Sequence, residues 1–333
     1  MSETDKTQEF SKDRGPRTAS SIWQLANTVL PFAGLLVLMY FSLSVSYWIT
    51  LALGILAGGF MVRVFIIQHD CGHGSFFKSR EANNRTGRLC SLVTMIPYYY
   101  WRRQHALHHS TSGNLDRRGF GDVSTHTVVE YQRMTKFERF KYRAYRNPFV
   151  FLGLGPLALY LITNRFAFDK VQTSKRERHN VYVTNLTVAV MFALLGWWLG
   201  FGKLFLIAVP VMYVAAAAGI WLFYIQHQFD PSYWKRQPEW DYTASATEGS
   251  SFFKLPKVLQ WFTGNIGYHH VHHLQERIPN YRLQQVYDET PELHDVHTLT
   301  LGSSLKTMFL GLWDEEHERL ISFREFARAA RSA

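Results

Sequence analysis

The chain is organised around the stretch Trp101-Arg-Arg-Gln-His-Ala-Leu-His-His109. Its histidines at positions 105, 108 and 109 follow i, i+3, i+4 spacing, which in a helix places all three imidazoles on one face. The pattern recurs twice. His69-Asp-Cys-Gly-His73 gives an i, i+4 pair, and His269-His-Val-His-His273 gives another triple with His270 as an additional histidine.

Three helical clusters of histidine predict a metal site. A single zinc ion uses three or four ligands, so eight histidines suit two transition-metal ions bound by imidazole nitrogens. The eight are His69, His73, His105, His108, His109, His269, His272 and His273. A lone histidine is usually a structural residue. We give that interpretation to the five that lack the spacing, which are His126, His179, His294, His297 and His317.

The composition narrows the class of protein only slightly. A formal charge of +10 fits nucleic acid, anionic lipid or an acidic protein as partner. The two cysteines, Cys71 and Cys90, imply no disulfide framework. We interpret both as buried thiols, because Cys71 stands two residues after His69 and points away from the face of the histidine pair.

Apolar residues are concentrated in a few long runs. Residues 1–22 are polar and predict a disordered tail. The run at 28–67 has the length of two spans of about 20 residues each, interrupted near Ser44–Trp48, and contains one charge, Arg63, near its end. The segments 181–200 and 204–226 form a second pair. We therefore predict two transmembrane hairpins, at residues 23–68 and 181–226.

The polar segments 69–180 and 227–333 carry the histidine clusters. Segment 69–180 is rich in lysine and arginine, whereas the first external turn has none and the second only Lys203. The positive-inside rule therefore places both termini and all three clusters in the cytoplasm, and Trp48, Trp197 and Trp198 at the external interface.

Three further helices are expected in these polar segments. The apolar stretch Pro148–Thr163 is short for a span, and fits either an interfacial helix or a buried helix of the polar part. We also expect a helix from about Pro256 through the third cluster, and a surface helix at 323–330. The predicted fold is an all-α membrane protein with four transmembrane helices and a cytoplasmic helical cap that carries the metal site.

The residues around the clusters favour iron over zinc. Zinc would make a Lewis-acid hydrolase, which needs a carboxylate base. Asp70 is suited to orienting the imidazole of His69, but projects about 100° away around the helix and is a poor base. Iron would allow oxygen activation at the membrane surface, within reach of acyl chains. His227 follows the last span as His69 follows the second, and this reasoning leaves its role as a ligand open.

Longer stretches around the clusters match a known family in order. They are His69-Asp-Cys-Gly-His-Gly-Ser-Phe-Phe77, His105 to Asp116, Trp221-Leu-Phe-Tyr-Ile-Gln-His-Gln228, Gly264-Asn-Ile-Gly-Tyr-His-His-Val-His-His273 and Ile278-Pro-Asn-Tyr281. These clusters resemble the three histidine boxes of the membrane fatty-acid desaturases. The sequence over about residues 60–285 is similar to that of the bacterial acyl-lipid branch, which includes delta-5 and delta-12 phospholipid desaturases.

The resemblance implies a di-iron centre with the eight histidines as ligands and His227 as a ninth. It leaves His270 as a structural residue or a partner of the ligands. The acyl-CoA branch has an asparagine one turn before the last-span histidine to hold a water at the metal, and Phe223 stands there in this chain. We take Asn265, four residues before His269, as the candidate for the missing polar group. No catalytic residue is predicted beyond the metal centre.

The resemblance also implies the reaction. O2 and two electrons introduce a cis double bond into the acyl chain of a phospholipid at the inner (cytoplasmic) membrane, without nucleic acid. No fused cytochrome b5 domain is evident, so electrons are expected from a separate ferredoxin- or flavodoxin-like carrier. Alternatives are a di-iron lipid or carotenoid hydroxylase or ketolase, and a metal-dependent lipid hydrolase. A metal transporter would carry polar residues deep in several spans, and the spans show few.

Overall fold

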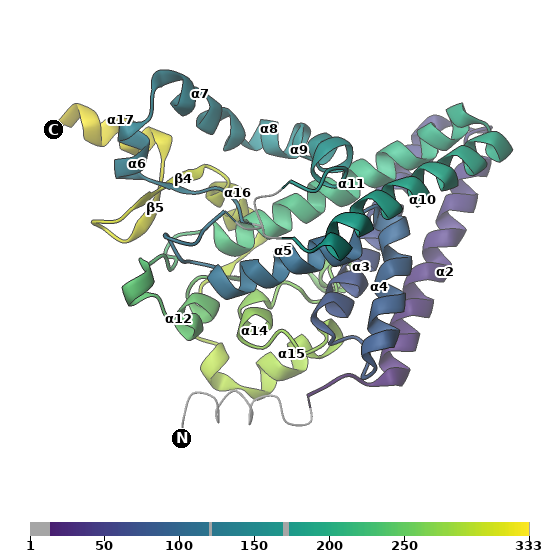
Figure 1. The fold of residues 1–333 in the computed structure, drawn as a ribbon, viewed down its shortest axis with the longest axis horizontal. Coiled ribbons are helices and arrows are strands. Elements are labelled where there is room, and N and C mark those ends of the chain that lie inside the picture. The colour runs from purple at the N-terminus through teal and green to yellow at the C-terminus, as the bar shows by residue number, and fades with distance from the viewer. Residues whose placement is uncertain (1–13, 120–121, 169–172, 333) are drawn as a thin grey trace.

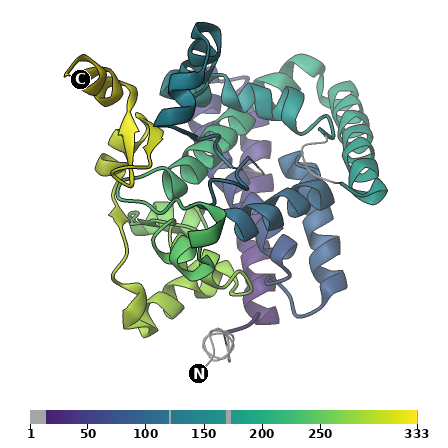
Figure 2. The same ribbon diagram turned by 60° about the vertical axis from the view of Figure 1, so that its left-hand side comes forward.

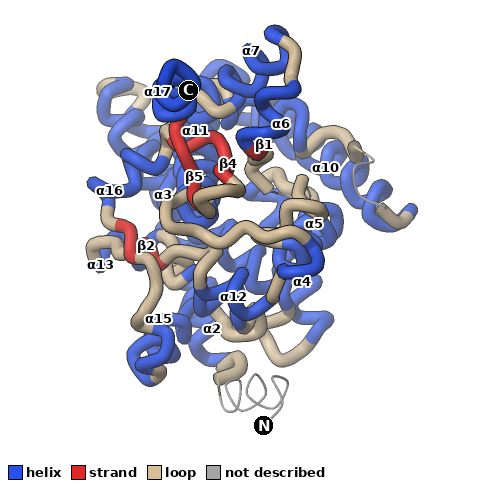
Figure 3. The backbone as a smooth tube through the Cα atoms, turned by 90° about the vertical axis from the view of Figure 1, so that its left-hand side faces the viewer, coloured by secondary structure: helices blue, strands red, loops and turns tan. Residues whose placement is uncertain are grey.

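The computed structural model describes residues 14–119, 122–168 and 173–332. Helices dominate it (Figure 3). Four of them are long and apolar enough to cross a membrane. They are α2 (Thr18–Ser42), α3 (Tyr47–His73), α10 (Lys175–Leu199) and α11 (Phe201–His227). The four predicted spans and the all-α class are therefore confirmed.

The helix ends differ from the predicted boundaries for local reasons. Residues 1–13 lie outside the described residues, but 18–22, predicted as tail, belong to α2. Helix α3 runs through the first histidine pair and ends where Gly74 adopts a left-handed conformation with a φ of 72°. Helix α10 begins before residue 181 because Ser174 and Glu177 form a capping box at its start.

Helix α3 is the centre of the bundle and packs against both α2 and α11. A Cβ atom at Gly58 would lie 2.6 Å from Cγ1 of Val214, so glycine permits the close approach of α3 to α11. Met39, Ala57 and Val211 are buried between the helices. The outer faces expose large apolar side chains, among them Leu30, Ile55, Leu186 and Leu206. A protein with such faces is an integral membrane protein.

Shorter helices form a cap at one end of the bundle (Figures 1 and 2). They include α4 (Arg80–Thr94), α5 (Tyr98–Thr111), α12 (Tyr242–Thr247), α13 (Lys257–Phe262), α14 (His269–Leu274) and α15 (Asn280–Glu289). The predicted helix from Pro256 through the third cluster was wrong as a continuous element. The chain breaks between α13 and α14, where Gly264 and Asn265 take φ angles of 53° and 57°.

The apolar stretch at residues 148–163 forms three short helical pieces in place of one helix. They are α8 (Pro148–Gly153), α9 (Gly155–Ala158) and the π-helix η1 (Leu159–Thr163). One side contacts α11, while Phe149, Leu154 and Leu161 are exposed. This exposure fits the interfacial alternative better than a buried helix.

Short strands join the C-terminal part of the chain to the cap, which the sequence did not predict. Strands β1 (His126–Thr127), β4 (Leu310–Asp314) and β5 (Arg319–Ser322) form one sheet in the order β1-β4-β5. Strands β2 (Phe252–Phe253) and β3 (Thr298–Leu299) pair in parallel. The remaining elements are α6 (Val128–Arg133), α7 (Lys136–Tyr145), η2 (Gln237–Glu239), η3 (Pro291–Leu293), α16 (Leu301–Thr307) and α17 (Phe323–Ser332). Helix α17 is the surface helix expected at 323–330.

Candidate metal centre

Nine imidazoles from four helices meet inside the cap in two groups. The five-histidine group contains His69, His73, His105, His109 and His272, and the four-histidine group contains His108, His227, His269 and His273. Within each group the nitrogen atoms lie within 4.8 Å of one another. These are all nine of the predicted ligands, His227 included. Their role as ligands stays a prediction.

Spacing between the ring nitrogens tests whether a metal ion fits. In the four-histidine group, Nε2 of His227 lies 3.1 Å from Nε2 of His108 and 2.9 Å from Nε2 of His269. In the other group, Nε2 of His109 lies 3.1 Å from that of His272 and 3.2 Å from that of His105. Two nitrogens bound to one ion at about 2.1 Å lie about 3 Å apart when they meet at a right angle. The spacing therefore suits two metal ions.

Hydrogen bonds at Nδ1 fix the orientation of two rings and the direction in which their Nε2 atoms point. Nδ1 of His227 lies 3.1 Å from the carbonyl oxygen of Gly249, which only accepts, so this nitrogen carries the proton. Nδ1 of His108 is hydrogen-bonded to the carboxylate of Asp122 in the same way. The two Nε2 atoms then face each other, 3.1 Å apart. When both rings are neutral these atoms present lone pairs that repel each other, and a cation bound between them would remove that repulsion.

Burial favours the neutral form of these rings. It lowers the pKa of His105, His109, His269, His272 and His273 well below the ordinary value, and repulsion between neighbouring charged imidazoles adds to the effect. Neutral imidazole is the form that binds a metal ion. These five rings are therefore in the form that can bind a metal ion across the ordinary pH range.

Carboxylates orient several of the rings. Oδ1 of Asp70 lies 3.1 Å from Nδ1 of His69, in line with the orienting role proposed for this residue. Oε2 of Glu276 lies 3.1 Å from Nδ1 of His73. Although burial opposes it, the hydrogen bond with His73 holds the pKa of Glu276 below its ordinary value. Sequence reasoning missed Glu276 and also Asp122, since neither belongs to a histidine cluster.

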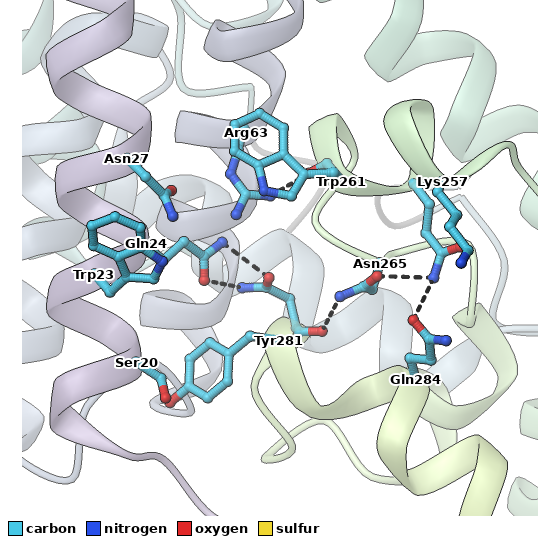
Figure 4. Close-up of a pocket in the computed structure, with 12 residues that line it drawn as sticks. Ser20, Trp23, Gln24, Asn27, Arg63, Lys257, Trp261, Asn265, Tyr281 and Gln284 are labelled. Atoms are coloured by element: carbon cyan, nitrogen blue, oxygen red, sulfur yellow. Dashed lines mark hydrogen bonds between the residues drawn. The ribbon is translucent and has the colours of Figure 1, made fainter.

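The carboxylate of Asp70 extends the metal centre to the first membrane helix. Its Oδ2 accepts hydrogen bonds of 2.7 Å from both the backbone N–H and the side-chain amide of Asn280. The Oδ1 atom of Asn280 in turn accepts a 3.0 Å hydrogen bond from Gln24 on α2 (Figure 4). A buried chain of polar groups therefore connects α2 to the ring of His69.

Two other predicted residues lie away from the rings. Asn265 accepts a hydrogen bond from Gln260 and donates one to the carbonyl of Asn280, each over about 3 Å. Its amide is therefore engaged away from the rings and does not replace the asparagine that is missing at position 223. His270 is buried against Phe252, and burial lowers its pKa to about 3. The histidines interpreted as structural (126, 179, 294, 297 and 317) also lie outside both groups.

An apolar cavity of about 460 Å³ adjoins both histidine groups. His69, His105 and His269 line its inner end, and its walls come from α3, α5, α9, η1 and α11. On α11 it extends as far as Ala215, eight residues before Phe223. The ring of Phe223 stands 5.0 Å from that of His108. The volume and the mostly apolar lining of the cavity are typical of a site for a small lipophilic ligand.

The fold and the site together define an integral membrane protein in which a histidine metal site adjoins an apolar cavity. The fatty acid desaturase family matches residues 46–302. The fatty acid desaturase of Bacillus subtilis (strain 168) is 45% identical over 318 residues, covering 96% of this chain and 90% of the relative. This chain therefore belongs to the fatty acid desaturase family, as its histidine boxes indicated, and is an oxidoreductase that acts on fatty acyl chains.

Two more distant relatives carry more specific names. The sn-1 oleoyl-lipid 12-desaturase of Picosynechococcus is 28% identical over 261 residues, covering 74% of this chain and 71% of the relative. The sn-1 acyl-lipid omega-3 desaturase (ferredoxin) of Synechocystis is 29% identical over 238 residues, covering 67% of this chain and 62% of the relative. Both names describe desaturases of acyl lipids, so the hydroxylase and hydrolase alternatives are not favoured.

Proposed function

We propose that this protein is a di-iron desaturase that introduces a cis double bond into the acyl chain of a membrane phospholipid. Two adjacent methylenes lose two hydrogen atoms. These, together with O2, two electrons and two protons, give two molecules of water. The observation that carries the proposal is the apolar cavity that ends at the two histidine groups.

The cavity walls have the task of holding an unreactive hydrocarbon chain still beside the histidines. The apolar side chains that make up most of the lining exclude water and favour contact with a methylene chain. Trp101 stacks on the ring of His105 and Phe223 contacts the ring of His108, so both aromatic rings stand where the chain meets the centre. A small residue at Gly219 leaves the cavity wide further from the histidines.

Nine imidazole nitrogens suit iron, which when bound with O2 and two electrons can remove hydrogen from an unactivated methylene. The protein's part is to hold the rings in place. Asp70, Asp122 and Glu276 accept hydrogen bonds from Nδ1 and so direct Nε2 of three rings inward. These carboxylates also place negative charge around the centre, which stabilises a cation there.

The proposed electron donor is a separate ferredoxin- or flavodoxin-like protein. One acyl-lipid relative is named with ferredoxin. An acidic carrier would be attracted to exposed basic residues of the cap such as Arg85, Arg88 and Arg103. The same charges support a cytoplasmic cap in the inner membrane, and Trp48 and Trp197, exposed by more than 80%, lie near the opposite turns, as an interfacial belt would.

Expression in a host that lacks the corresponding unsaturated fatty acids tests the proposal. Gas chromatography–mass spectrometry of the membrane lipids should show a new acid two mass units lighter than its precursor, formed only with O2. Replacing His108 by alanine should abolish it. The matched control is His179→Ala, which removes an exposed histidine outside both groups and should leave the yield unchanged.

Other products would contradict the proposal. A gain of one oxygen would identify a hydroxylase, and release of free fatty acid without O2 would identify a hydrolase. An unchanged yield from H108A would remove the histidine centre from the mechanism. Iron is tested separately, by measuring the metal content of the purified protein.

A further inference from the structure

A second pocket lies between α2 and the segment that holds Lys257 and Trp261 (Figure 4), apart from the apolar cavity beside the histidines, which is called the acyl cavity below. It has a volume of about 560 Å³ and is formed by residues of α2, α3, α13 and α15 together with the turn after α13. The linings of the two spaces share no residue. Most of its lining side chains are polar: two cations and several amides lie beside two tryptophans. We refer to it as the Arg63 pocket.

Arg63 is held rigidly in the wall of the pocket. Its side chain is buried, its Nε donates to Oγ1 of Thr28 over 3.1 Å, and its Nη1 donates to the backbone carbonyl of Trp261. The guanidinium lies over the indole ring of Trp261 at 4.0 Å (Figure 4). These contacts fix the orientation of the cation but do not neutralise its charge.

No carboxylate compensates this charge in the described part of the chain. None of the ion pairs there includes Arg63, and its Nη2 has no hydrogen-bond acceptor among the described residues. The pocket lining contains no aspartate or glutamate, and Lys257 adds a second cation at its edge. A buried cation without a counter-ion is costly unless an anion binds to it.

The surroundings of the pocket place it at the surface of the membrane. Helix α13 exposes Val258, Leu259 and Trp261, and Trp23 on α2 is 68% exposed. Apolar residues and tryptophans beside a lysine are typical of a short helix at the lipid–water interface. At that depth the abundant anion is the phosphate of a phospholipid headgroup.

We propose that the Arg63 pocket binds the phosphate of a phospholipid other than the substrate. The guanidinium of Arg63 donates from Nη2, Lys257 contributes a second charge from the edge, and the acyl chains follow the apolar outer faces of α2 and α3. The pocket is separate from the acyl cavity, so this binding does not depend on the proposed reaction. A free phosphate ion offers the same chemistry and is distinguished by experiment.

Native mass spectrometry of the purified full-length protein tests the proposal with phosphatidylglycerol as the probe. Lys257→Gln should weaken binding about fivefold, the effect of one exposed cation near an anionic lipid. Arg63→Gln removes a charged hydrogen bond and should weaken it at least about tenfold. The matched control is Lys254→Gln, an exposed lysine outside the lining, which should bind as the unmodified protein does. Diacylglycerol with the same chains should bind more weakly.

Three results would overturn the proposal. Unchanged binding in Lys257→Gln would exclude the pocket, and this exposed position gives an answer even if Arg63→Gln does not fold. Equal binding of diacylglycerol would show that the phosphate is not recognised. Displacement of phosphatidylglycerol by millimolar inorganic phosphate would assign the pocket to the free ion in place of the lipid.

Discussion

Replacing Asp122 by asparagine should weaken metal binding by the four-histidine group and leave metal binding by the five-histidine group unchanged. The carboxylate is buried and hydrogen-bonded to Nδ1 of His108, a member of that group alone. Asparagine keeps an oxygen acceptor at almost the same position but removes the negative charge. The ring of His108 should keep its orientation and become a weaker donor of its lone pair.

The size of the effect follows from what each substitution removes. Loss of a hydrogen-bond partner of a metal-ligating histidine lowers metal affinity by about 10–100-fold. Asp122→Asn retains the hydrogen bond and belongs near the lower limit, about tenfold or 1.4 kcal/mol. Asp122→Ala removes both charge and hydrogen bond, and belongs near the upper limit, about 100-fold.

Metal content after equilibration with increasing chelator measures both affinities. In Asp122→Asn one ion per chain should be lost at about tenfold lower chelator than in the unmodified protein, while the other ion is retained. Asp288→Asn, at an exposed site away from both groups, is the control, and circular dichroism should show unchanged helix content. Parallel loss of both ions, or loss of neither, would refute the assignment of Asp122 to one group.

Three further substitutions test other parts of the site. Glu276→Gln should lower the metal affinity of the five-histidine group about tenfold and leave that of the four-histidine group unchanged, as the same chelator titration would show. Gly219→Leu places a side chain in the acyl cavity, at a position where an added Cβ meets no atom within 4 Å. It should lower the yield of unsaturated product from long acyl chains about tenfold, as measured by gas chromatography. The control is Gly202→Leu on the same helix but outside the cavity lining, which should leave the yield unchanged. Asn265→Ala should lower stability by about 1–2 kcal/mol in thermal unfolding without loss of metal, because alanine there adds left-handed strain.

The sequence predicted the features that depend on local periodicity. Long apolar runs identified α2, α3, α10 and α11, because a membrane span needs only length and composition. Helical spacing identified the histidines on α3 and α5, because the helix itself brings i, i+3 and i+4 together. Comparison with the family, more than spacing, identified His227 as a candidate ligand.

Features that depend on tertiary contact were missed. Asp122 reaches His108 only because the loop after α5 folds back over that helix, and Glu276 reaches His73 across some 200 residues of chain. The break before α14 had a local signal, the Gly264-Asn265 pair, which is typical of a turn. The helical spacing of the third histidine cluster favoured a continuous helix in spite of this turn signal. That spacing in fact requires only the short helix α14.

Helix α14 contributes His272 to one group and both His269 and His273 to the other. During synthesis, the first 268 residues supply four imidazoles to the five-histidine group but only two to its neighbour. A ribosome-bound chain of that length therefore has one nearly complete histidine group and one that is half complete. If each group binds one ion, as proposed, the second ion can be held only after the polypeptide has been made beyond residue 273 and α14 has docked against helices inserted long before.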